Sequence, residues 1–106
     1  MLNQITLCGR VSKISKKSIN EEGTNAKLTI AVQRSFKNAE GVYETDFIDV
    51  NIFNSVAENT IEYCKNGDVI GIKGRLSVDA ENKLSVNAER VMFLSSNRDI
   101  KEENNN

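Results

Sequence analysis

The chain has 106 residues, of which 39% are hydrophobic and 27% are charged, and its formal net charge is −1. This composition is typical of one globular domain and excludes a disordered chain or one embedded in a membrane. With no long apolar run and no charged-then-apolar leader, the sequence predicts a cytoplasmic protein that makes no membrane contact.

The residue types that most often carry catalysis or bind metals are scarce. There is no histidine, no CxxC pair and no phosphate-binding loop of the GxxxxGK type. The two cysteines, Cys8 and Cys64, are expected to be buried, reduced thiols, because free cysteine behaves as a small hydrophobic residue. We therefore expect no enzyme, no metal site and no cofactor.

Two strands are predicted in the first third of the chain. Residues 3–14 alternate well enough for a strand, with a bend or bulge at Gly9. Residues 16–23 begin with Lys16 and Lys17 and read as a polar turn. Residues 27–33 form the second predicted strand. Its inward side chains are Leu28, Ile30 and Val32.

A hairpin is predicted next, because an Asn-x-x-Gly turn at residues 38–41 separates two alternating segments. The turn brings Phe36 and Tyr43 close to each other at the tip of the hairpin. Arg34 and Lys37 lie alongside these rings in the sequence.

The third predicted strand, residues 45–54, has an unusual outer face. Its inward side chains are Ile48, Val50 and Ile52. Its outward side chains are Phe47, Asp49, Asn51 and Phe53. Two aromatic rings thus share a side whose polar residues should contact water. At strand rise they are roughly 20 Å apart, which leaves room for several stacked nucleobases.

A helix of about three turns is predicted after this strand. Ser55 and Glu58 have the spacing of a capping box at its start, and Gly67 follows its end. The remaining residues predict a fourth strand at 69–78 and a fifth at 83–94, joined by a short turn at 79–82.

The fourth strand has Ile70, Ile72, Leu76 and Val78 as its predicted inward side chains, and Lys73 and Arg75 as its outward ones. In the fifth strand the alternation slips near Glu89 and Arg90, which predicts a bulge.

The order of these elements predicts an all-β fold. One helix between the third and fourth of five strands is the order of the OB-fold, a small, partly open barrel. The pattern alone also fits other small β-rich domains. We expect residues 1–95 to form the domain and residues 96–106 to be a polar, disordered tail.

Aromatic and basic residues are interleaved on the faces predicted to be exposed. The rings are Phe36, Phe47 and Phe53, with Tyr43 as a fourth candidate. The nearby cations are Arg34, Lys37, Lys73 and Arg75. Single-stranded nucleic acid needs this mixture, since rings stack on bases and cations follow the phosphates. The alternative is that some rings pack under a loop or in a subunit interface.

Five segments carry a resemblance to a known family. They are MLNQ at 1–4, LCGRV at 7–11, AVQRSFKN at 31–38, TDFI at 45–48 and GIKGRL at 71–76. In order and spacing they resemble the bacterial single-stranded DNA-binding protein family, over residues 1 to about 94.

The resemblance implies an OB-fold and non-catalytic coating of single-stranded DNA in DNA replication, recombination and repair, in the cytoplasm at the nucleoid. It implies a homotetramer, with a dimer as the smaller option, and the edge of residues 3–10 is where we expect subunits to pair. The family's stacking aromatics fall on Phe36, Phe47 and Phe53. Its basic groove residues fall on Arg10, Arg34 and Lys37, and by proximity on Lys73 and Arg75.

The sequence departs from the family in two places. Residues 78–84 form a short turn without a ring, where many members have a long hairpin with another stacking aromatic. This predicts a smaller footprint and weaker binding. The chain has no proline and ends at Asn106 without the acidic tip of typical members, so recruitment of repair enzymes by a tail is not carried over.

Two questions stay open from the residues. The short chain fits a mobile-element, phage or paralogous form as well as the core of a longer protein. The rival function is an OB-fold protein-interaction or assembly module, whose aromatics are buried by a protein partner and whose DNA affinity is vestigial.

Overall fold

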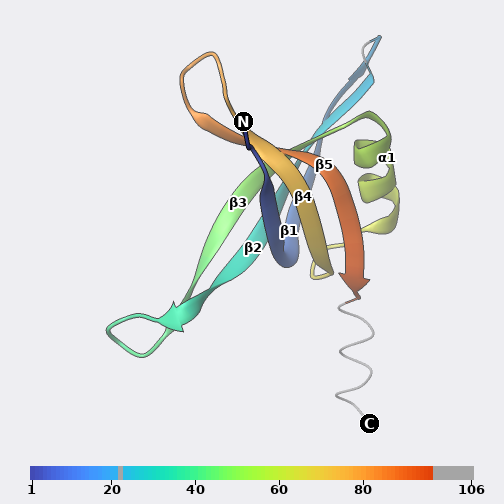
Figure 1. Ribbon diagram of the computed structural model, residues 1–106. Coiled ribbons are helices and arrows are strands. Elements are labelled where there is room, and N and C mark those ends of the chain that lie inside the picture. Colours follow the sequence, from blue (N-terminus) through green and yellow to red (C-terminus); the bar gives the residue numbers. More distant parts are fainter. Residues whose placement is uncertain (22, 97–106) are drawn as a thin grey trace.

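The computed structural model, which describes residues 1–21 and 23–96, is a closed five-stranded barrel with one helix (Figure 1). The elements are β1 (Ile5–Asn20), β2 (Gly23–Lys37), β3 (Tyr43–Phe53), α1 (Asn54–Tyr63), β4 (Val69–Val78) and β5 (Leu84–Ser95). The strand order around the barrel is β1-β2-β3-β5-β4. The predicted OB-fold, with its helix between the third and fourth strands, is confirmed, although the barrel is closed where a partly open one was expected.

Three antiparallel hairpin pairings and two long-range pairings build the barrel. β1 pairs with β2, β2 with β3, and β4 with β5, each antiparallel. β1 also pairs with β4, from Ile5 opposite Gly74 to Arg10 opposite Val69. The barrel closes through a short parallel contact in which Asn51 of β3 lies opposite Asn87 of β5. The β1–β2 and β2–β3 hairpins project beyond the barrel body (Figure 1).

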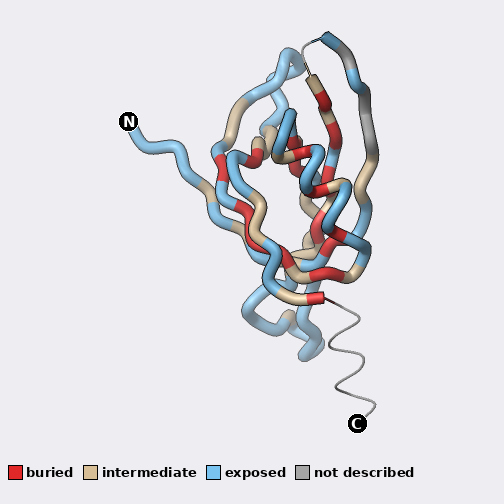
Figure 2. Tube along the Cα trace, turned by 90° about the vertical axis from the view of Figure 1, so that its right-hand side faces the viewer, coloured by how far each residue is buried: buried red, intermediate tan, exposed pale blue. Residues whose placement is uncertain are grey.

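The core is the inner face of the barrel, and its largest side chains are among those that the alternation predicts to point inward. The largest fully buried side chains are Leu28, Ile30, Val50, Ile52, Ile70 and Ile72. Buried positions alternate with exposed ones along the strands (Figure 2). Burying one such side chain stabilises the fold by about 1.5–3 kcal/mol, so this cluster holds the strands in register.

The first strand is longer than predicted, and the turn predicted at 16–23 comes only after Asn20. β1 continues through Lys16 and Lys17 because it keeps pairing with β2 as far as Asn20 opposite Gly23. Its register shifts lie after Val11 and after Lys16 rather than at Gly9. A glycine is needed at position 9 because the backbone of β2 comes very close to it. A Cβ at this position would lie 2.5 Å from the carbonyl oxygen of Ala31.

The capping box predicted for the helix is also wrong. Phe53 occupies the N-cap position, and the cap has no side-chain hydrogen bond. Glu58 instead accepts a 3.1 Å hydrogen bond from the hydroxyl of Thr24, which ties α1 to β2. The predicted bulge in β5 is confirmed at Glu89, since Lys73 lies opposite Arg90 while the next residue, Gly74, lies opposite Ala88.

Three further predictions concern burial. Cys64 is buried as predicted, and burial raises the pKa of its thiol, with Asp68 adding to the effect. Cys8 is exposed, so its predicted burial is wrong; it lies opposite Gly71, and side chains at these positions of β1 and β4 point away from the core. Val78 is 57% exposed instead of inward, because it lies at the end of β4 beyond the core.

Beyond β5, the predicted tail lies outside the described residues apart from Ser96, which is buried. No helix within residues 1–21 and 23–96 is long and apolar enough to cross a membrane.

Candidate nucleic-acid interface

The outward side of β3, together with its neighbours on β2, forms a surface that we call the stacking face. Phe47 is 67% exposed and Phe53 is 42% exposed, and both point away from the core side chains of β3. Their predicted exposure is confirmed. Their cross-strand neighbours on β2 are the small residue Ala31 for Phe47 and the polar residue Asn25 for Phe53. The rings therefore have open space in which a base could stack.

Register places cations beside these rings from neighbouring strands. One row across the sheet joins Arg10, Ala31 and Phe47, so the Cα atoms of Arg10 and Phe47 are about 10 Å apart. A second row joins Lys13, Thr29 and Asp49. A third row joins Lys27, Asn51, Asn87 and Arg75.

Two of these cations, Lys13 and Lys27, were not among the predicted site residues. Both are exposed. The signal that could have found them is their outward position in alternating strands, but their place beside β3 follows only from the register.

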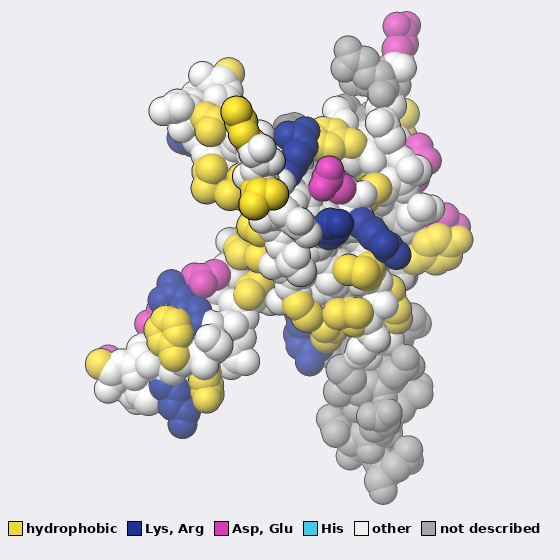
Figure 3. All heavy atoms as spheres, viewed as in Figure 1, with side chains coloured by type: hydrophobic (Ala, Val, Ile, Leu, Met, Phe, Trp, Pro, Cys, Tyr) yellow, Lys and Arg dark blue, Asp and Glu magenta, His cyan; other side chains and the backbone are white. Residues whose placement is uncertain are grey.

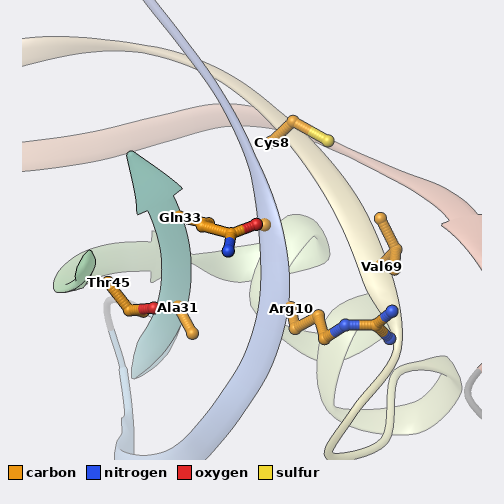
Figure 4. Close-up of a pocket in the computed structure, with 7 residues that line it drawn as sticks. Cys8, Arg10, Ala31, Gln33, Thr45 and Val69 are labelled. Carbon is orange, nitrogen blue, oxygen red and sulfur yellow. The ribbon is translucent and has the colours of Figure 1, made fainter. Parts of the chain in front are cut away.

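A hollow of about 400 Å³ opens between β1 and β2 next to Phe47's row. Its lining residues are Cys8, Gly9, Arg10, Ala31, Gln33, Thr45 and Val69. Gln33 points across the hollow toward β1, whereas Arg10 turns toward Val69 (Figure 4). The guanidinium of Arg10 donates a 2.9 Å hydrogen bond to the carbonyl of Gly67, which holds the side chain at the rim.

The tip of the β2–β3 hairpin is built as predicted. The side-chain oxygen of Asn38 accepts hydrogen bonds from the backbone N–H groups of Glu40 and Val42. Lys37 lies opposite Tyr43, with its ammonium 5.6 Å from the ring centre. Hydrophobic and basic side chains gather on this hairpin (Figure 3).

Phe36, also on this hairpin, is 65% exposed. It falls in an irregular stretch of β2 between Gln33 and Lys37, where the ladder is interrupted.

Arg34 lies on the other side of the hairpin from Phe47. Its guanidinium donates two hydrogen bonds to Asp46, of 3.0 and 2.9 Å, and one of 2.8 Å to Glu44. Asp46 and Phe47 are neighbours in a strand and point to opposite faces. The hydrogen bond from Arg34 also holds the pKa of Asp46 below its ordinary value. The charge of Arg34 is thus matched by two carboxylates.

The remaining predicted cations, Lys73 and Arg75, are both exposed but lie on different parts of the barrel surface. Lys73 lies opposite Thr6 of β1 and Arg90 of β5, on the β1–β4–β5 side of the barrel. Arg75 lies in the row that reaches the stacking face through Asn87. Of the eight predicted residues, the structure places Phe47, Phe53, Arg10 and Arg75 in rows of the stacking face, puts Phe36 and Lys37 on the β2–β3 hairpin, and sets Arg34 and Lys73 apart.

Known proteins are similar to this chain in sequence and in fold. A model of the single-strand binding protein family matches residues 2–97. Single-stranded DNA-binding protein B of Bacillus subtilis is 39% identical over 89 residues, covering 82% of this chain and 79% of its own. Single-stranded DNA-binding protein 1 of Clostridium acetobutylicum is 38% identical over 108 residues, covering 92% of this chain and 98% of its own.

Two solved structures share the fold at lower identity. A small single-stranded DNA-binding protein from Streptomyces coelicolor superposes with a TM-score of 0.67 at 20% identity, covering 89% of this chain and 95% of its own. The wild-type single-stranded DNA binding protein from Thermus aquaticus gives 0.69 at 24% identity, and this chain spans 51% of its length.

Proposed function

This chain belongs to the single-strand binding protein family, and from that premise we propose that it binds and protects single-stranded DNA without reading a defined sequence. The observation that carries the proposal is the stacking face, where Phe47 and Phe53 are exposed on one side of β3 with cations in the neighbouring rows. Rings accept the π-face of any base and cations follow the phosphates, so binding needs no catalytic group. Replication, recombination and repair are the processes that expose such strands.

The proposed contacts differ in kind. Phe47 and Phe53 stack bases, and Phe36 and Tyr43 extend the aromatic surface onto the hairpin. The cations that contact phosphates are Arg10, Lys13, Lys27, Lys37 and Arg75. We assign Arg34 to joining the two strands of the hairpin, because three of its donors are taken by Asp46 and Glu44. Lys73 is left as a contact at the margin of the surface.

We also propose that the protein assembles through β1, as a tetramer or a dimer. Residues 5–9 of β1 pair with β4 on one side, and no strand of the described chain pairs with them on the other. An unpaired strand edge is a template for a second copy. Nearby, Met92 and Leu94 of β5 lie over Gly71, and Leu94 is 54% exposed. Light scattering distinguishes the two assemblies, and a monomer would contradict both.

Titration with oligopyrimidine single strands, at low and at high salt, tests the binding proposal. We expect single strands to bind more tightly than a duplex of the same length and to retain affinity at high salt. Tighter binding to the duplex would contradict the proposal. Binding to neither strand nor duplex would favour the rival interaction module, for which the relatives' names give no support.

A further inference from the structure

Between the two exposed rings, the stacking face carries a carboxylate, Asp49. Asp49 lies two residues after Phe47 on the same side of β3, and it is exposed. Its Oδ1 accepts a 2.7 Å hydrogen bond from the hydroxyl of Thr29. Within residues 1–21 and 23–96, Asp49 has no ion pair. A surface proposed to bind a polyanion therefore has an acceptor-only group near its centre.

A second hydrogen-bond acceptor, the side chain of Asn51, lies next to Asp49 on the same side of β3. Asn51 donates a 3.2 Å hydrogen bond to the side-chain oxygen of Asn87, and Asn87 donates one of 2.6 Å to the hydroxyl of Ser77. This chain of donors fixes both amides. It leaves the Oδ1 of Asn51, like the Oδ2 of Asp49, without a hydrogen bond from the part of the chain that the structure describes.

Three of the cations lie on one side of these acceptors, whereas Arg75 lies on the other side, beyond Asn87 of β5. Lys13 and Arg10 are on β1, and Lys27 is on β2, two strands and one strand away from β3 in the sheet order. A phosphate is attracted to the cations and repelled by Asp49. A bound strand should therefore run its phosphates along β1 and β2 and turn its bases over β3, where the two acceptors face their edges.

We propose that Asp49, with Asn51 beside it, makes this surface favour bases that carry an exocyclic amino group over those that carry a carbonyl there. The inference rests on the proposed function, since a base must first stack on this face. Cytosine N4 and adenine N6 donate hydrogen bonds to a carboxylate. Uracil and thymine present the acceptor O4 at the same position and are repelled. The result is a bias in base composition, not the reading of a sequence.

The test compares oligo(dC) with oligo(dU) of equal length, because the two bases are close in size and differ only at positions 3 and 4, where cytosine has N3 and the N4 amino group and uracil has N3–H and O4. We expect the unmodified protein to bind oligo(dC) about fivefold more tightly, the lower end of what one good base contact provides. Asp49→Asn keeps the shape and an oxygen for the Thr29 hydroxyl, but adds donors and removes the charge. It should bring the ratio close to one while raising the affinity for both strands.

Glu62→Gln is the matched control. Glu62 is exposed near the end of α1 and belongs to none of the strand rows that form the stacking face, and this change removes the same charge. It should leave the preference for oligo(dC) intact. Equal affinity of the unmodified protein for both strands, or an unchanged ratio in D49N, would overturn the inference. Absence of binding to either strand would instead be a failure of the proposed function, and the inference would fall with it.

Discussion

At the scale of single residues, the rings of the stacking face can be tested without disturbing the fold. Phe47 is two-thirds exposed and lies outside the core cluster, so Phe47→Ala should leave the thermal unfolding midpoint almost unchanged. We expect it to weaken single-strand binding by roughly 1–3 kcal/mol, the range measured per stacked base in single-strand binding proteins as a class. Fluorescence anisotropy with a labelled oligonucleotide measures the loss.

Phe93→Ala is the control for this change. Phe93 has similar exposure, 52%, but lines a cleft between β5 and α1 with Tyr63 and Cys64. It should have little effect on DNA affinity. Equal losses in the two variants would show that exposed rings act through general hydrophobicity and not through the stacking face.

The contact between Arg34 and Asp46 also depends on a single residue, and it should depend on pH. Its hydrogen bonds lower the pKa of Asp46 in the folded protein, so this contact is present above the ordinary pKa of an aspartate, about 3.9. The contact is lost as the pH falls through the lowered value. Arg34→Gln should raise the pKa of Asp46 toward its ordinary value, as followed by NMR of the carboxyl carbon. Arg10→Gln should not, since Arg10 bonds to Gly67.

The same experiment has a second readout. If Arg34 joins the hairpin strands, R34Q should weaken DNA binding less than removal of a cation on the stacking face, such as Lys27→Gln. An unchanged Asp46 titration in R34Q, or a larger loss of binding than in K27Q, would contradict that role.

At the scale of elements, the two glycines of β4 differ in how much space a side chain would have. A Cβ on Gly74 would overlap the carbonyl oxygen of Asn87 in β5, whereas a Cβ on Gly71 would make ordinary contacts, the nearest being the flexible ends of Met92 at 3.4 Å and Leu94 at 3.7 Å. Gly74→Ala should destabilise the fold by about 1–3 kcal/mol, because the β4–β5 ladder must separate next to its bulge. Gly71→Ala should be nearly neutral. Thermal unfolding distinguishes the two, and equal midpoints would contradict the argument.

The strands with a buried face were predictable, because alternation records burial directly. β3 and β4 therefore begin and end close to their predicted bounds, and the slip of the pattern at Glu89 indicated the bulge. The second half of β1 was missed, because its mostly polar residues carry no alternation of buried and exposed positions, although they pair with the start of β2 that follows directly. The cap was missed because Thr24, which is distant in the sequence, binds Glu58.

The candidate site divides in the same way. Phe47 and Phe53 could be found from one strand, since both share its outward side. Lys13 and Lys27 could not, because only the register places them in rows with β3. The role of Arg34 depends on which neighbours its side chain reaches, and local spacing does not show this.

At the scale of the whole molecule, a net charge of −1 and few phosphate contacts predict a shallow salt dependence. If about three to five cations of the stacking face each meet a phosphate, the slope of log K against log salt should be about −2 to −4 for a single strand. A protein bound through ten phosphates would show about −7 on the same rule. The affinity that remains at high salt should then come from the rings.

The double variant Phe47→Ala with Phe53→Ala separates these two sources of affinity. It should lose most of the binding at high salt while keeping the slope, since the cations are untouched. Lys13→Gln with Lys27→Gln should do the opposite, making the slope shallower by about 1.4 units while the affinity at high salt changes little. A steep slope in the unmodified protein, with no binding left at high salt, would mean that charge and not stacking carries the interaction.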